Sequence, residues 1–152
     1  MTERAPAPRV PDNWTRIDPF PRIHTMRSFV SETLDTDRIR VMYFRVADEP
    51  LLRAKVWFGP GTEGPPGVAH GGAVAAALDE SVGGVAWMMG YRVVVARLTV
   101  DFRAMVRIGT DATLEASIAG VDGRKITCRA RLTDGDTLLA EAEALCVVLK
   151  EA

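Results

Sequence analysis

The sequence has little of what marks disulfide-rich, membrane-spanning or nucleic-acid-binding proteins. Its two cysteines, Cys128 and Cys146, lack the paired spacing of a zinc site and are too few for a disulfide framework. No stretch approaches the roughly 18 apolar residues that a membrane span needs. The 19 basic residues nearly balance the 20 acidic ones, and this net charge of −1 argues against a dominant nucleic-acid surface.

The start of the chain, MTERAPAPRVPDNW, also lacks the apolar core of a secretory signal. We therefore expect a cytoplasmic protein whose two thiols are buried as small core residues. A length of 152 residues suits a single domain with a substantial core. The prolines and charges near the start predict an extended or disordered arm over residues 1–22, followed by one domain over residues 23–152. A short helical turn or irregular packing is expected over residues 18–32.

Apolar and polar residues alternate along most of the chain, as they do in half-buried strands. Two such runs, 38–47 and 51–60, predict a hairpin around Asp48-Glu49-Pro50. Four more runs cover 93–108, 111–120, 125–132 and 137–149, and the last three are joined by Asp-Gly pairs typical of tight hairpin turns. The first of these four runs is expected to present one apolar face, made of Ala96, Leu98, Val100 and Phe102. An antiparallel meander of about four strands should therefore follow the hairpin.

One long helix is predicted, from Gly72 to about Met89. It follows a loop, residues 59–70, with four glycines and three prolines. Alanine dominates the helical segment, and Val74, Leu78 and Val82 recur at helical spacing as a core-facing stripe. A single apolar helix must bury itself against the sheet, which indicates a two-layer α+β domain.

Asp79 lies on a helix face made of small residues. Counted from Asp79, the positions at offsets −7, −4, −3, +4 and +7 are Gly72, Ala75, Ala76, Gly83 and Ala86. Small residues can simply permit close packing, but a charge beside a tight seam is costly unless it has a partner. The other interpretation is that they leave room for a ligand with Asp79 as its reactive acid. Glu80, about 100° further round the helix, is expected to be solvent-facing or paired.

At the start of the helix stands His70-Gly71-Gly72. The two glycines allow a tight bend and leave the first helical amides uncovered. Those amides have no intrahelical acceptor and carry the positive end of the helix dipole. They can therefore receive an anion or a developing oxyanion.

The stretch GPPGVAHGGAVAAALDESVG, residues 64–83, resembles the PaaI-like group of hotdog-fold acyl-CoA thioesterases. The shared pattern is His-Gly-Gly, a small apolar run, an acid and a following glycine. Weaker similarity in the strand segments extends the resemblance to about residues 38–149. It implies a hotdog fold, in which a curved antiparallel sheet of five to six strands wraps a long central helix. It also implies a homodimer or dimer of dimers with active sites at the subunit interface.

The activity implied by this resemblance is hydrolysis of an acyl-CoA thioester, with no cofactor or metal beyond the coenzyme A of the substrate. Asp79 matches the catalytic acid, which acts as general base or as nucleophile. Gly72, with Gly71 beside it, matches the amide that polarises the thioester carbonyl, and His70 matches a histidine that shapes the loop and orients that carbonyl. Positions that contact coenzyme A in relatives correspond to Asp101, Arg103, Arg124 and Lys125, although each also fits an ordinary solvated charge.

Two positions depart from the family pattern. Val95 stands where relatives often carry a threonine or serine that assists the acid, and the nearby Thr99 lies too far along the strand to match that position. Met105 replaces a common proline. The first departure keeps a second hypothesis open, that of a hotdog protein that binds acyl-CoA without hydrolysing it. A hydratase or dehydratase on the same fold is a third, for which no second motif is found.

The acyl group is not defined by the sequence. Several large apolar residues could line an acyl pocket or belong to the core: Trp57, Phe58, Trp87, Met88 and Met89.

Overall fold

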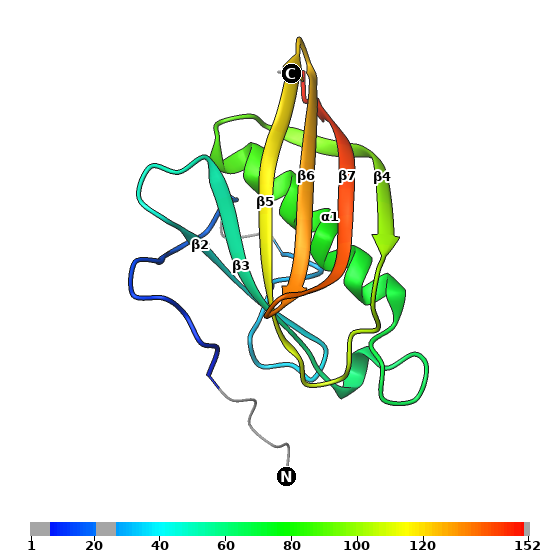
Figure 1. Ribbon diagram of the computed structural model, residues 1–152. Helices are drawn as coiled ribbons and strands as arrows, with labels where there is room; N and C mark the ends of the chain where they lie inside the picture. Colours follow the sequence, from blue (N-terminus) through cyan, green and yellow to red (C-terminus); the bar gives the residue numbers. More distant parts are fainter. Residues whose placement is uncertain (1–6, 21–26, 151–152) are drawn as a thin grey trace.

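The structure is a computed structural model that describes residues 7–20 and 27–150. One long helix, α1 (Gly71–Met88), packs against one face of a seven-stranded antiparallel sheet. Figure 1 shows α1 crossing behind the long strands of the sheet at an angle to them. The predicted two-layer α+β architecture with a single central helix is confirmed, and the helix bounds agree within a residue.

The strands are β1 (Thr15–Ile17), β2 (Ile39–Arg45), β3 (Leu51–Phe58), β4 (Val93–Phe102), β5 (Asp111–Asp122), β6 (Lys125–Asp134) and β7 (Thr137–Val148). Their order across the sheet is β1-β2-β3-β5-β6-β7-β4. The predicted β2–β3 hairpin is confirmed, as are both Asp-Gly turns of the meander. Gly123 and Gly135 occupy the left-handed region at φ +57° and +55°, which explains why glycine follows each aspartate there.

The sheet has one strand more than the five to six expected. The extra strand is β1, three residues of the N-terminal segment that pair antiparallel with the outer edge of β2, from Thr15 opposite Arg45 to Ile17 opposite Tyr43. Three residues are too few to show an alternating pattern, so only the free edge of β2 identifies them as a strand. Of the irregular segment expected over residues 18–32, positions 21–26 lie outside the described residues, and a turn occupies 29–31.

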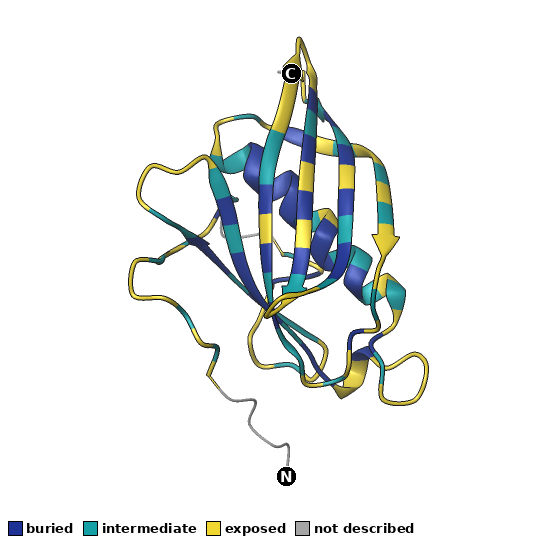
Figure 2. Ribbon diagram, in the orientation of Figure 1, coloured by how far each residue is buried: buried dark blue, intermediate teal, exposed yellow. Residues whose placement is uncertain are grey.

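The core lies between α1 and the inner face of the sheet. Figure 2 shows buried and exposed residues alternating along the central strands. Leu78 and Val82 on the predicted helix stripe are both 0% exposed. The two cysteines are also fully buried and free, as the sequence predicted.

Within residues 7–20 and 27–150, strand β4 forms the other edge of the sheet and bonds only to β7. Its register shifts between Val95 and Arg97, so Ala96 is the extra residue of a bulge and is exposed. The prediction that Ala96 shares the buried face of this strand is therefore wrong. The inward positions run through Val93 and Val95 and then, after the bulge, through Leu98 and Val100.

Candidate active site

His70 is the N-cap of α1. Its Nδ1 accepts a hydrogen bond from the Gly72 amide at 2.8 Å. The loop holds His70 from the other side, because its own amide donates to the Thr62 carbonyl at 2.7 Å. A Cβ on Gly72 would lie 2.9 Å from that imidazole nitrogen, so glycine is needed at this position. The imidazole therefore does the work of a capping side chain.

This cap changes which amide is available at the helix start. Since the Gly72 amide is bonded to His70, the free donor of the first turn is Gly71, whose amide has no hydrogen-bond acceptor among the described residues. Gly71 lines a cavity of about 300 Å³, which we call the helix-start cavity. The ring of Phe102, from the end of β4, lies 3.4 Å from where a Cβ of Gly71 would be.

Asp79 lies two turns further along, on the wall of a larger cavity of about 510 Å³, which we call the Asp79 cavity. Most of its lining is small or apolar and includes Ala75, Ala76, Gly83, Val95, Leu98 and Trp87. Three of the five small residues predicted to share the face of Asp79 are in this set; Ala86 instead lies fully buried in the core. Partial burial, and then the neighbouring charge of Glu80, raise the pKa of the Asp79 carboxyl.

The cavity offers Asp79 no hydroxyl from β4. Val95 reaches the helix there, with Cγ2 3.9 Å from the position of a Cβ on Gly83. Thr99 is exposed and does not line the Asp79 cavity. The polar group that relatives are expected to carry near the acid is thus replaced by a methyl group.

Of the large apolar residues that were candidates for an acyl pocket, Trp87 lines the Asp79 cavity. Phe58 is 0% exposed and belongs to the core. Trp57 lies on another part of the sheet, where the Arg40 guanidinium stacks over its ring with Cζ 4.3 Å from the ring centroid of Trp57.

Glu80 is paired rather than solvent-facing. Its Oε1 accepts a hydrogen bond from the Tyr43 hydroxyl at 2.7 Å, and its Oε2 accepts one from Ser28 Oγ at 2.5 Å. The pKa of the Tyr43 hydroxyl is raised well above its usual value by burial and by the Glu80 carboxylate, so the hydroxyl stays protonated as a donor. Sequence reasoning missed Ser28 and Tyr43, because 52 and 37 positions separate them from Glu80.

The residues expected to contact coenzyme A fall into two separate pairs. Arg103 lines the helix-start cavity and lies 3.8 Å from Asp101, with a closer ion pair to Glu141 at 2.8 Å. Arg124 and Lys125 lie at the β5–β6 turn, where the Arg124 guanidinium donates to a backbone carbonyl of β7.

These two pairs are at opposite ends of the sheet. Val93 at the start of β4 faces Val148, next to the β5–β6 turn, whereas Phe102 at its end faces Ala140. Nine positions of a strand at roughly 3.3 Å each amount to about 30 Å. One protomer therefore does not bring all four residues to one ligand.

The first helical amide and the acid are also apart. Gly71 and Asp79 are eight positions apart on α1, or about 12 Å along the helix axis. A carbonyl carbon and its own oxygen are separated by about 1.2 Å. Within one protomer, these two groups cannot both act on a single thioester carbonyl.

Residues 66–141 match the family model described as Thioesterase superfamily. A curated relative, acyl-coenzyme A thioesterase THEM4 of Xenopus laevis, is 32% identical over 123 residues, which cover 78% of this chain and 55% of that protein. The chain thus spans about half the length of this relative. No helix in the described part of the chain is long and apolar enough to cross a membrane.

Solved structures share the fold. One described as a thioesterase superfamily protein is 28% identical, with a TM-score of 0.67 over 71% of this chain and 53% of that one. The PaaI protein of E. coli, from the phenylacetic acid degradation operon, has a TM-score of 0.66 and is 14% identical; the match covers 75% of this chain and 81% of the PaaI chain. Protein smu.793 of Streptococcus mutans, bound to acetyl CoA, has a TM-score of 0.68 and is 14% identical; the match covers 86% of this chain and 98% of the smu.793 chain. By family model, relative and fold, this chain belongs to the thioesterase superfamily, with the hotdog architecture of PaaI.

Proposed function

We propose that this protein hydrolyses an acyl-CoA thioester to a free acid and coenzyme A. The observation that carries the proposal is Asp79: a carboxyl with a raised pKa on the wall of a cavity of about 510 Å³ whose lining is mostly small or apolar. A raised pKa makes the carboxylate a stronger base, and the cavity offers space for an acyl group. Membership of the thioesterase superfamily and the name of the THEM4 relative favour this reaction.

Asp79 can take part in thioester hydrolysis in two ways. As general base it takes a proton from water while the water oxygen bonds to the thioester carbon. Collapse of the tetrahedral intermediate breaks the carbon–sulfur bond, and the proton goes to the leaving thiolate. As nucleophile it attacks that carbon itself, the carbon–sulfur bond breaks and the coenzyme A thiolate leaves, and water then hydrolyses the resulting mixed anhydride. Both routes require the acid and remain open.

The carbonyl oxygen needs a donor, and we assign that role to the Gly71 amide. The neighbouring amide of Gly72 is engaged by His70, as the 2.8 Å contact indicates. A donor at the positive end of a long helix suits a developing oxyanion. His70 is then a positioning residue that caps the helix, in keeping with the role the family resemblance implies for it.

Two copies are needed to build such a site. Because Gly71 and Asp79 are about 12 Å apart on one helix, we propose that the amide of one copy and the acid of another meet at the carbonyl. Strand β4 suits the role of interface: it is a ten-residue edge strand with one side unpaired by the described residues, and Val94 on it is 52% exposed. A long free edge of this kind is a template for pairing with another strand.

Antiparallel pairing of two β4 strands would also reunite the coenzyme A residues. The end of β4 in one copy, with Asp101 and Arg103, would then lie near the start of β4 in the second copy, next to its Arg124 and Lys125. Cationic groups gathered in this way suit the phosphates of coenzyme A. The cytoplasmic location and the arm boundary at residue 22 stay predictions.

A specific observation favours the alternative of a non-catalytic acyl-CoA binder, namely the methyl groups of Val95 where an assisting hydroxyl is expected. A panel of acyl-CoA substrates with a thiol reagent separates the two. Thiol release above the rate without enzyme is expected for at least one acyl group. Measurable acyl-CoA binding without thiol release from any substrate would replace the enzyme with the binder.

A further inference from the structure

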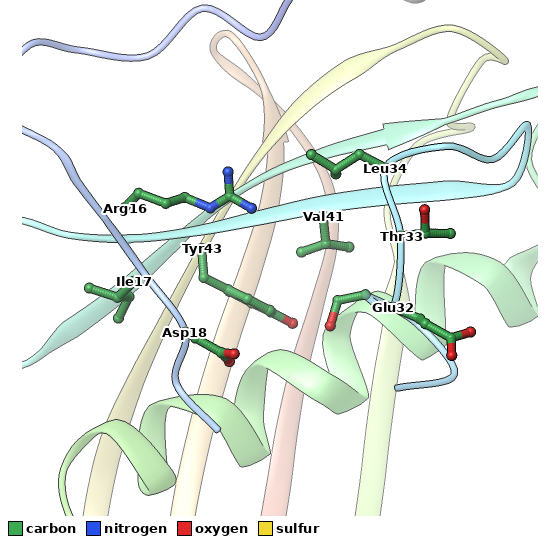
Figure 3. Close-up of a pocket in the computed structure, with 9 residues that line it drawn as sticks. Arg16, Ile17, Asp18, Glu32, Thr33, Leu34, Val41 and Tyr43 are labelled. Atoms are coloured by element: carbon green, nitrogen blue, oxygen red, sulfur yellow. The ribbon is translucent and has the colours of Figure 1, made fainter. Parts of the chain in front are cut away.

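The turn at Val30 and Ser31 stands between two cavities. Val30 lines the Asp79 cavity, and the next residue, Ser31, lines a second cavity of about 440 Å³. Figure 3 shows this second cavity, which we call the β1–β2 cavity, between β1, β2 and the segment after the turn. Both turn residues are 9% exposed, so the turn is packed into the structure rather than lying loosely over it.

The wall between the cavities is hydrogen-bonded. Tyr43 lines the β1–β2 cavity and points from β2 toward α1 (Figure 3), whereas Glu80 lines the Asp79 cavity. The 2.7 Å hydrogen bond between these two side chains joins one lining to the other. The wall is therefore a polar contact between β2 and α1 with the turn beside it.

Ser28 ties the turn to this wall. Its hydroxyl donates to Glu80 at 2.5 Å and also accepts from the amides of Val30, at 3.2 Å, and of Ser31, at 2.9 Å. One hydroxyl thus organises the backbone of the turn and attaches it to the helix residue next to Asp79. Phe29, 93% exposed, extends from the same turn over the rim of the Asp79 cavity.

We propose that Glu80 is a positioning residue that sets the length of acyl chain the protein accepts, an inference that rests on the proposed function. With Ser28 and Tyr43 it forms a latch that closes the Asp79 cavity at the Val30–Ser31 turn. An acyl chain that fills this cavity meets the latch. Opening the latch joins the Asp79 cavity to the β1–β2 cavity, where Ile17, Leu34 and Val41 offer a longer chain apolar surface beside the charged Arg16, Asp18 and Glu32.

Both carboxylate oxygens are needed for this role. Each accepts from a different element, Oε1 from β2 and Oε2 from the turn. A glutamine keeps the shape but replaces one of the two acceptor oxygens with a donating NH₂ group, so at least one of the two hydroxyl–carboxylate hydrogen bonds is lost. The latch thus explains why an acid follows Asp79 directly, although a second charge there disfavours ionisation of Asp79.

The test measures binding without turnover. Calorimetry with S-alkyl-CoA thioethers from ethyl to hexadecyl gives affinity against chain length for wild type, Ser28→Ala, Tyr43→Phe and Glu80→Gln. In wild type the affinity should stop rising at an intermediate length. In the three variants the affinity should continue to rise with chain length. The hexadecyl thioether should bind to each variant at least about tenfold more tightly than to wild type, because each buried methylene raises the binding constant roughly threefold to fourfold. Glu143→Gln, on the exposed Glu143–Arg129 ion pair, is the control that keeps the wild-type profile.

Hydrogen exchange supplies a second readout. The Val30 and Ser31 amides should exchange faster in Glu80→Gln than in wild type, because Ser28 loses the acceptor that holds it. A length profile that is the same in wild type and all three variants overturns the latch, as does an unchanged exchange rate of both amides. Absence of thioester hydrolysis in wild type would overturn the proposed function alone, because the binding profile does not depend on turnover.

Discussion

The Gly72 amide and Nδ1 of His70 are joined by a 2.8 Å hydrogen bond across the first turn of α1. This bond makes the histidine of the motif a helix cap and leaves the amide of Gly71 as the available donor. It also explains the second glycine of the pair, because a side chain at Gly72 would collide with the imidazole. The motif therefore divides its residues between holding the helix start and presenting one amide to a ligand.

Replacing Asp79 by asparagine should lower kcat/KM for acyl-CoA by at least about 10²-fold, the usual scale of general acid–base catalysis. Asparagine preserves the size of the side chain but removes the base. Steady-state kinetics with the best substrate of the acyl-CoA panel provides the measurement, and the oligomeric state by light scattering should not change. Turnover near the wild-type value would mean that the catalytic acid lies elsewhere.

Proline in place of Gly71 removes the proposed oxyanion donor with little disturbance of the helix. Proline is favoured at the first helical position, and His70 at ψ 138° has the extended backbone that must precede it. We expect kcat to fall by about 10²- to 10³-fold, as for loss of one oxyanion donor elsewhere. Gly71→Ala adds a Cβ but keeps the N–H, so it is the matched control. Equal losses in the two variants would assign the effect to bulk near Phe102 rather than to the amide.

Mixing these two inactive proteins tests whether the site is shared between copies. If Asp79 of one copy works with Gly71 of the other, a mixed dimer of Asp79→Asn and Gly71→Pro contains one complete site. After unfolding and refolding together in equal amounts, about a quarter of wild-type activity should return, because half of randomly paired dimers are mixed. A mixture no more active than its separate components would require both groups to come from the same copy, against the 12 Å separation.

His70 should matter more for stability than for chemistry. His70→Ala removes the cap and should reduce the free energy of unfolding by about 1 kcal/mol, whereas His70→Asn, with another good capping side chain, should restore most of it. Denaturant unfolding measures both. Activity in His70→Asn should stay well above that of Asp79→Asn, and a loss as deep as that of Asp79→Asn would make His70 a reacting group.

The raised pKa of Asp79 has a consequence for stability. Because the folded protein holds the Asp79 proton more tightly than the unfolded chain, ionisation costs stability as the pH rises through the unfolded and then the folded pKa. Asp79→Asn should therefore be at least as stable as wild type at neutral pH. The difference should vanish below the ordinary aspartate pKa of about 3.9. Thermal unfolding across this range checks it; a variant less stable than wild type at neutral pH contradicts it.

Local patterns were sufficient for most of the fold. Alternation in the strands, two Asp-Gly pairs and one alanine-rich helix predict the two layers, because turn chemistry and periodicity act over a few residues. The face of small residues around Asp79 was predictable for the same reason. The bulge at Ala96 and the strand β1 were not, since both depend on which residues the neighbouring strand presents.

The candidate active site has features that the sequence predicts and features that depend on the tertiary structure. The sequence alone determined that His70, Gly71, Gly72 and Asp79 stand at one end of a helix and two turns along it, because helical spacing is local. Only the tertiary structure decided which amide is free, that Glu80 is tied to Ser28 and Tyr43, and that Arg103 lies far from Arg124. The first follows from the side-chain conformation of His70, two positions before Gly72, which helical spacing alone does not fix. The other two depend on segments distant in sequence, and packing of the layers, not spacing along the chain, brings such side chains together or keeps them apart.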